Sequence, residues 1–171
     1  MTLKPANYKD RSTKGTSLTG GRGMGYVYAE IELVNEDDVA LHRHGLLLES
    51  EIKKVTCRAL VDCGAWDLVI NEEVRQQLNL PVIERQAVEM ADETVREVDV
   101  VGPIEVRFEN KKTIVNAVVM PGTSGVLLGA YPMEGLDVMI DPKRERLIVN
   151  PPWPNNPKAH IRTIKQVSLS I

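Results

Sequence analysis

Alternation of apolar and polar residues is the dominant pattern of this chain, and it predicts mostly β-structure. Ala29, Ile31 and Leu33 alternate with polar neighbours, which indicates a half-buried strand starting near Tyr26. Further strands are predicted at 52–61, 82–90, 94–101, 104–108 and 113–120, and a closing hairpin at 136–140 and 146–149. Short strands separated by turn signals are typical of a mostly β barrel or sandwich, here with one or two short helices.

Helices and turns are predicted from capping and turn residues. Asn71 can cap a helix over 71–78, where two early glutamates suit the positive end of the helix dipole, and Leu80-Pro81 ends it. A helical turn is predicted at 131–135. The predicted turns lie at 35–38, 91–93, 102–103, 109–112 and 141–144.

The segment 41–48 contains two histidines, His42 and His44, on either side of an arginine. Two histidines one residue apart could bind a metal, but no further Cys, Asp or Glu stands at a recognised ligand spacing. An exposed hairpin tip is the prediction for this segment, and neither a metal nor a cofactor is expected.

Three regions follow one another along the chain. Residues 1–24 are rich in Lys, Arg, Ser, Thr and Gly and predict a flexible arm, whose terminal glycines lack the preceding strand of a phosphate-binding loop. Residues 25–152 carry the strand pattern and form the predicted domain. In the tail, 153–171, apolar and polar residues alternate over 166–171, as in an edge strand that could pair with a partner.

Composition limits the classes of function. A chain of 171 residues suits one domain with tails, and its 4% aromatic content means a mostly aliphatic core. The net charge of -3 gives no basic surface for nucleic acid, and no apolar run approaches the roughly 20 residues of a membrane span. Two cysteines without a secretory signal predict free thiols in a reducing compartment, by default the cytoplasm.

Candidate chemistry centres on Asp62, which follows an apolar strand and precedes Cys63, Gly64 and Ala65. A lone aspartate in such a turn usually caps nearby N–H groups. Two copies of this loop meeting across a two-fold axis would bring two carboxylates together, and like charges at close range share a proton. One carboxylate could then act as a base on water while the other donates to a substrate carbonyl.

The run Leu60-Val61-Asp62-Cys63-Gly64-Ala65, followed downstream by Leu127-Leu128-Gly129, resembles the retropepsin-like aspartic proteases. It is most similar to the compact single-domain bacterial members, over roughly Met24 to Pro152. The resemblance implies a closed β-barrel that works as a homodimer and hydrolyses bonds in a peptide or protein substrate, without metal or cofactor.

The same resemblance implies roles for individual residues. Asp62 matches the catalytic aspartate, and Cys63, Gly64 and Ala65 complete the active-site loop. Leu127, Leu128 and Gly129 match the segment that packs beneath that loop. The hairpin tip with Met90, Ala91 and Asp92 matches the flap that closes over a bound peptide. Trp66 and Asp67 would line the cleft, or serve as a core aromatic and a solvated carboxylate.

Cys63 departs from the pattern, because the family has Thr or Ser there, whose hydroxyls brace the two loops across the dimer. A thiol is a weak donor and acceptor, so this brace should loosen. Three interpretations remain open: a working but less rigid dimer, an inactive dimer that binds peptides or acts as a scaffold, and a redox switch through a Cys63 disulfide.

A cysteine nucleophile is a separate hypothesis for this chain. It would need a histidine base beside Cys63 or Cys57, and the three histidines fall on the predicted hairpin tip and in the tail. Cys57 belongs to an alternating apolar strand face, which favours a place in the core. The sequence therefore favours peptide-bond hydrolysis by water between two copies of Asp62.

Overall fold

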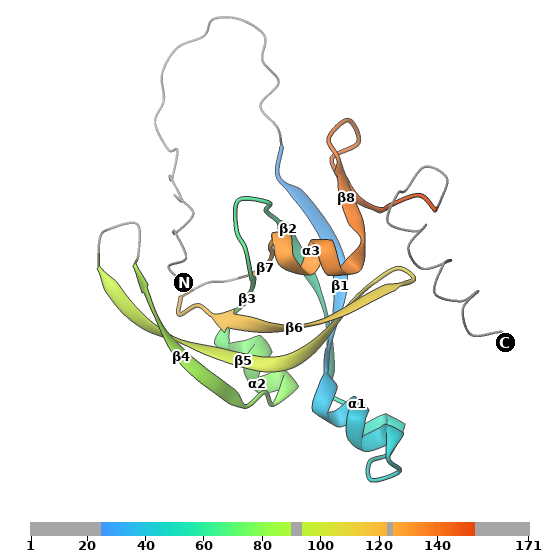
Figure 1. Ribbon diagram of the computed structural model, residues 1–171, viewed down its shortest axis with the longest axis vertical. Helices are drawn as coiled ribbons and strands as arrows, with labels where there is room; N and C mark the ends of the chain where they lie inside the picture. The colour runs from blue at the N-terminus through green and yellow to red at the C-terminus, as the bar shows by residue number, and fades with distance from the viewer. Residues whose placement is uncertain (1–24, 90–93, 123–124, 153–171) are drawn as a thin grey trace, which may run out of the picture.

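The computed structural model describes residues 25–89, 94–122 and 125–152, and it is built mainly of β-strands (Figure 1). The strands are β1 (Val27–Asn35), β2 (Lys54–Val61), β3 (Leu68–Ile70), β4 (Val82–Glu89), β5 (Val95–Phe108), β6 (Lys111–Val119), β7 (Val126–Leu128), β8 (Val138–Asp141) and β9 (Arg146–Val149). The helices are α1 (Glu36–Arg43), α2 (Glu72–Leu78) and α3 (Ala130–Leu136), with a 3₁₀ turn at Glu49–Glu51.

Some predictions cannot be compared with this structure. Those for the arm 1–24, for Met90, Ala91 and Asp92, and for the tail 153–171 lie outside the described residues. Among the helices that are described, none has the length and apolar character needed to cross a membrane.

Six strands close into a barrel. The sheet runs β1-β2-β7-β3-β6-β5-β4, and β1 also pairs with β5, from Glu32 opposite Arg107 to Asn35 opposite Ile104. β4 lies outside this ring and pairs with β5 as the first strand of a hairpin, while β8 and β9 form a separate two-stranded sheet. The closed, mostly β fold predicted from the sequence is therefore confirmed.

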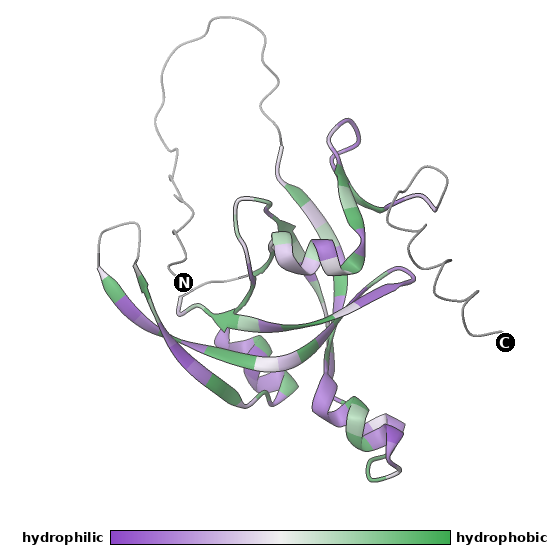
Figure 2. Cartoon of the chain, viewed as in Figure 1, coloured by the Kyte–Doolittle hydropathy of each residue, from purple (hydrophilic) through white to green (hydrophobic). Residues whose placement is uncertain are grey.

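The barrel interior is aliphatic, as the low aromatic content requires. β1 buries Val27, Ala29, Ile31 and Leu33, and the residues between them from Tyr28 to Glu32 are exposed or half-buried, so the predicted alternation is confirmed. In Figure 2 hydrophobic and hydrophilic residues likewise alternate along the long strands β4 and β5. Each fully buried Leu or Ile of such a core contributes about 1.5–3 kcal/mol, so the strands are held together mainly by their inward faces.

Residues 35–38 start a helix, which corrects the predicted bend. Asn35 is the N-cap of α1, and its side-chain oxygen accepts a hydrogen bond from the Asp38 backbone N–H at 3.2 Å. The same cap residue followed by acidic residues can begin a turn or a helix, and no apolar periodicity distinguished the two. His42 and His44 consequently lie at the end of α1 and not at a hairpin tip, and the described residues form three short α-helices where one or two were predicted.

The predicted turn at Gly102-Pro103 is also wrong, because β5 continues through it. The register with β6 shifts between Val101 and Ile104, so β5 accommodates one extra residue as a bulge. Gly102 has a φ of 149°, and a side chain there would come within 2.7 Å of Asn116 Oδ1. The glycine that suggested a turn thus serves a bulge in a continuous strand.

The predicted helix at 71–78 is confirmed as α2, with Asn71 accepting from the Val74 N–H at 2.9 Å. α3 confirms the predicted helical turn, and β8 and β9 confirm the closing hairpin.

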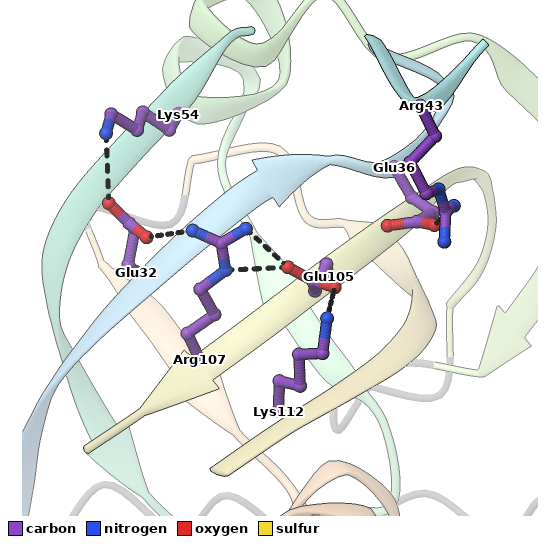
Figure 3. A network of polar contacts seen from close by, with 7 residues as sticks. All are labelled: Glu32, Glu36, Arg43, Lys54, Glu105, Arg107 and Lys112. Carbon is purple, nitrogen blue, oxygen red and sulfur yellow. Dashed lines mark hydrogen bonds and ion pairs between the residues drawn. The ribbon is translucent and has the colours of Figure 1, made fainter. Parts of the chain in front are cut away.

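Charged side chains cross the outside of the barrel where β1 meets β5 (Figure 3). Glu105 of β5 is only 2% exposed, and its carboxylate accepts from Arg107 at 2.6 Å and from Lys112 of β6 at 3.0 Å. Arg107 also donates to Glu32 of β1 at 2.9 Å, and Lys54 of β2 lies 3.8 Å from the same glutamate. This network, which we call the closure network, links all four strands around the seam of the barrel.

Candidate active site

Asp62 opens the loop that connects β2 to β3. Its backbone N–H donates to the carbonyl of Leu128 at 3.1 Å, which continues the pairing of β2 with β7 by one residue. Its Oδ1 accepts from the Gly64 N–H at 2.8 Å, and the Ala65 N–H donates to the Asp62 carbonyl at 3.2 Å. The carboxylate is therefore held by its own turn at the end of a strand.

The Leu127–Gly129 run fixes this loop from the side. β7 lies between β2 and β3, parallel to β2 and antiparallel to β3, so that Leu128 is opposite both Val61 and Leu68. A side chain on Gly129 would come within 2.7 Å of the Trp66 carbonyl, so only glycine fits where the two segments cross.

The first residues of α3 hold the far end of the loop. The Ala130 N–H donates to the Ala65 carbonyl at 2.8 Å, and the Tyr131 N–H donates to the Trp66 carbonyl at 2.9 Å. Backbone hydrogen bonds thus hold both ends of the Asp62 loop, and its small residues leave its outer surface open.

Within the loop, Cys63 and Gly64 are exposed, whereas Asp62 and Ala65 are half-buried. An exposed Cys63 next to the carboxylate is free to face another copy of the chain or a bound molecule. Residues 90–92, assigned to the flap, are not described, but β4 and β5 lead into that tip with Glu89 paired to Val95.

The two cysteines differ in environment. Cys57 lies half-buried on β2 against the core, and burial raises the pKa of its thiol to about 11, so it is protonated at neutral pH. His42 and His44 sit at the end of α1, which precedes β2, whereas Cys63 follows the opposite end of β2 (Figure 1). In the described part of the chain, no histidine is therefore placed to activate either thiol.

A cleft begins directly after the loop, and we call it the acidic cleft. It has a volume of about 290 Å³, and its polar and aromatic lining is formed by Trp66, Asp67, Glu84, Gln86, Asn116 and Tyr131. Trp66 and Tyr131 stack with ring centroids 5.8 Å apart and an interplanar angle of 25°. Burial raises the pKa of Asp67 above its usual range.

The resemblance implied that Trp66 and Asp67 line a cleft, with a core aromatic and a solvated carboxylate as the alternative, and nothing in the sequence pointed to Glu84, Gln86 or Tyr131. Glu84 and Gln86 are two apart on β4 and hence on one face, yet the sequence gives no sign that this face turns toward the Asp62 loop. In the described ranges, no three His, Cys, Asp or Glu side chains are grouped as a metal ion would require.

Comparisons with known proteins bear on the same segment. Residues 48–131, which include Asp62 and Leu127–Gly129, match the family model described as aspartyl protease. No curated protein matches the chain.

Two solved structures are among those to which the chain is similar. The retroviral protease-like domain of Ddi1 from Leishmania major is 16% identical with a TM-score of 0.47, covering 73% of this chain and 88% of that one. A retropepsin-like aspartic protease from Rickettsia conorii is 17% identical with a TM-score of 0.42, covering 68% and 77%. The family match over residues 48–131 confirms the resemblance to the retropepsin-like aspartic proteases found in the sequence.

Proposed function

We propose that this chain is an aspartic endopeptidase that works as a homodimer and hydrolyses peptide bonds of a peptide or protein substrate. The observation that carries the proposal is the Asp62 loop, in which backbone contacts from β7 and α3 fix one carboxylate beside small residues. Asp-x-Gly occurs once in the chain, so a pair of such carboxylates requires two copies.

In the proposed reaction one Asp62 is ionised and its mate is protonated, because two adjacent carboxylates cannot both carry charge comfortably. The ionised carboxylate removes a proton from water, and the water oxygen bonds to the substrate carbonyl carbon. The protonated mate gives its proton to the carbonyl oxygen. Collapse of the tetrahedral intermediate breaks the C–N bond: the amine leaves with a proton from the first carboxylate, and one hydroxyl of the intermediate returns its proton to the mate.

The Asp62→Asn variant tests this proposal. Both proteins are incubated under reductant with a mixed peptide library, from acidic to neutral pH, and the products are identified by mass spectrometry. Loss of a general acid–base group costs about 10²–10⁴-fold in rate, so cleavage should disappear in the variant. Asp99→Asn is the matched control, because Asp99 pairs with Arg85 outside the cleft, and this variant should cleave like the wild type.

Sedimentation of the same samples determines whether the chain is a dimer. Cleavage that persists in Asp62→Asn would refute the two-carboxylate mechanism. A wild-type dimer that binds peptides but cleaves none would instead favour the non-catalytic peptide-binding or scaffold module that Cys63 leaves open.

A further inference from the structure

The acidic cleft has walls of one sign of charge. Asp67 follows the Asp62 loop and Glu84 comes from β4, and among the described residues the lining contains no Lys, Arg or His. Arg85 lies between Glu84 and Gln86 in sequence, but it pairs with Asp99 at 3.3 Å, and neither of the two lines the cleft. Arg85, the cationic residue nearest to Glu84 in sequence, therefore does not pair with the carboxylates of the cleft.

Asp67 is the least compensated of these groups. Its carboxylate makes no hydrogen bond or ion pair with the residues that the structure describes, although it is half-buried. Burying a carboxylate without a partner is unfavourable, and the raised pKa of Asp67 has this cause. Glu84 accepts from Gln86 Nε2 at 2.7 Å through one oxygen, which leaves its other oxygen available. A cation entering the cleft would supply the missing partner for both acids.

The stacked pair of Trp66 and Tyr131 gives the cleft a second, independent preference for a cation. Trp66 is 52% exposed and Tyr131 is 49% exposed, so their stacked rings contribute open surface at the cleft. Their backbones are held together by the Tyr131 N–H bond to the Trp66 carbonyl at 2.9 Å. Exposed aromatic rings attract cations, and a planar guanidinium stacks on them better than an ammonium does.

The dimensions and place of the cleft indicate where such a cation would come from. A volume of about 290 Å³ accommodates one long side chain, and the cleft begins four residues after Asp62. A peptide whose bond lies at Asp62 would therefore have a nearby side chain within reach of Trp66 and Asp67.

We propose that the acidic cleft is a specificity subsite for a basic side chain of the substrate, arginine before lysine. Asp67 and Glu84 would pair with the charged group, and Trp66 and Tyr131 would pack on its flat face. This inference rests on the proposed function, because it assigns the substrate class of that same site.

Positional peptide libraries test the subsite. Each position near the cleaved bond carries in turn arginine, lysine or citrulline, which is a neutral isostere of arginine. At one position the full-length protein should cleave the arginine peptide about tenfold faster than the citrulline peptide, because a hydrogen bond to a charged group contributes about that much. Asp67→Asn should remove most of this preference, Glu84→Gln should reduce it, and the control Asp99→Asn should keep it.

Binding is measured separately from cleavage, so that the two proposals can fail independently. Fluorescein-labelled arginine and citrulline peptides are titrated by anisotropy against Asp62→Asn, with and without Asp67→Asn. Tighter binding of the arginine peptide that depends on Asp67 supports the subsite even if the wild type cleaves nothing.

Three results would overturn the subsite. Cleavage without a basic preference would do so while leaving the proposed function intact. A basic preference that neither Asp67→Asn nor Glu84→Gln alters would place its origin elsewhere. Absence of both binding and cleavage would overturn both proposals. Glu84 is exposed on β4, so its variant keeps the test decisive if Asp67→Asn fails to fold.

Discussion

Glu105 and Asp67 are two acidic residues of the same fold that differ in burial and in the partners of their carboxylates. Glu105, at the seam of the barrel, is almost fully buried and contacts Arg107 and Lys112. Asp67, in the acidic cleft, is half-buried and has no partner among the described residues. The more deeply buried charge is thus the compensated one.

The pKa values move in opposite directions for this reason. Burial acts to raise the pKa of the Glu105 carboxyl, but the hydrogen bonds and charges of Lys112 and Arg107 outweigh it, and the pKa is lowered. Asp67 has only the burial, and its pKa is raised. A charge that the fold compensates stabilises the fold, whereas one left without compensation is available to a ligand.

The largest effect on stability is expected for Glu105→Gln. The neutral side chain loses charge-assisted bonds to two cations, which costs about 1.5–3 kcal/mol of the free energy of unfolding. Both cations are partly exposed, so water limits the loss. Urea unfolding at neutral pH measures this loss. Asp99→Asn is the control, because Asp99 lies on the same strand as Glu105 but pairs with the exposed Arg85 of β4, and such a surface pair is worth about 0–1 kcal/mol. Equal losses in the two variants would contradict the special role of the closure network.

Acid should remove the Glu105 contribution. A carboxyl whose pKa is lower in the folded than in the unfolded protein stabilises above the unfolded pKa, and this is lost as pH falls through the folded value. The stability difference between wild type and Glu105→Gln should therefore be full at neutral pH and shrink below about pH 4.3, the ordinary pKa of Glu. Denaturant midpoints at several pH values measure it, and a constant difference would assign the effect to packing.

The sequence predicted the strands and helices that repeat a local pattern. The alternation in β1 and the Asn71 cap are local signals, and both gave the observed elements. Turns were wrongly predicted at Asn35 and Gly102, because the same residue types also occur at helix starts and in bulges. Only the tertiary pairing decides among these structures.

The residues of the candidate site likewise divide into those that could be predicted from the sequence and those that could not. Asp62, Gly64 and Gly129 could be selected from the sequence because a turn and a backbone crossing need those residue types. Glu84 and Tyr131 could not, since they reach the cleft from β4 and α3 only after the barrel has closed. Cys63 was also selected from the sequence, but the effect proposed for it requires a second copy of the chain.

Cys63→Thr tests the loop that would meet a second copy of the chain in the proposed dimer. A hydroxyl is a better donor and acceptor than a thiol, so one restored hydrogen bond should strengthen the proposed dimer by about 0.5–1.5 kcal/mol. Sedimentation equilibrium measures the dimer dissociation constant, with cleavage rates beside it. An unchanged constant would mean that the loops are not braced through this position.

The smallest effect, and one of opposite sign to Glu105→Gln, is expected for Asp67→Asn. A carboxyl whose pKa is raised in the folded protein destabilises it above the unfolded pKa, and this penalty is absent at low pH, where both states are protonated. The variant should therefore be more stable than wild type at neutral pH, by about 0.5 kcal/mol or less because solvent screens a half-exposed group. The gain should vanish below about pH 3.9, the ordinary pKa of Asp. Thermal unfolding at both pH values measures it. A loss of stability at neutral pH would mean that Asp67 already has a partner in the folded protein. The unpaired carboxylate from which the cation subsite was inferred would then not exist.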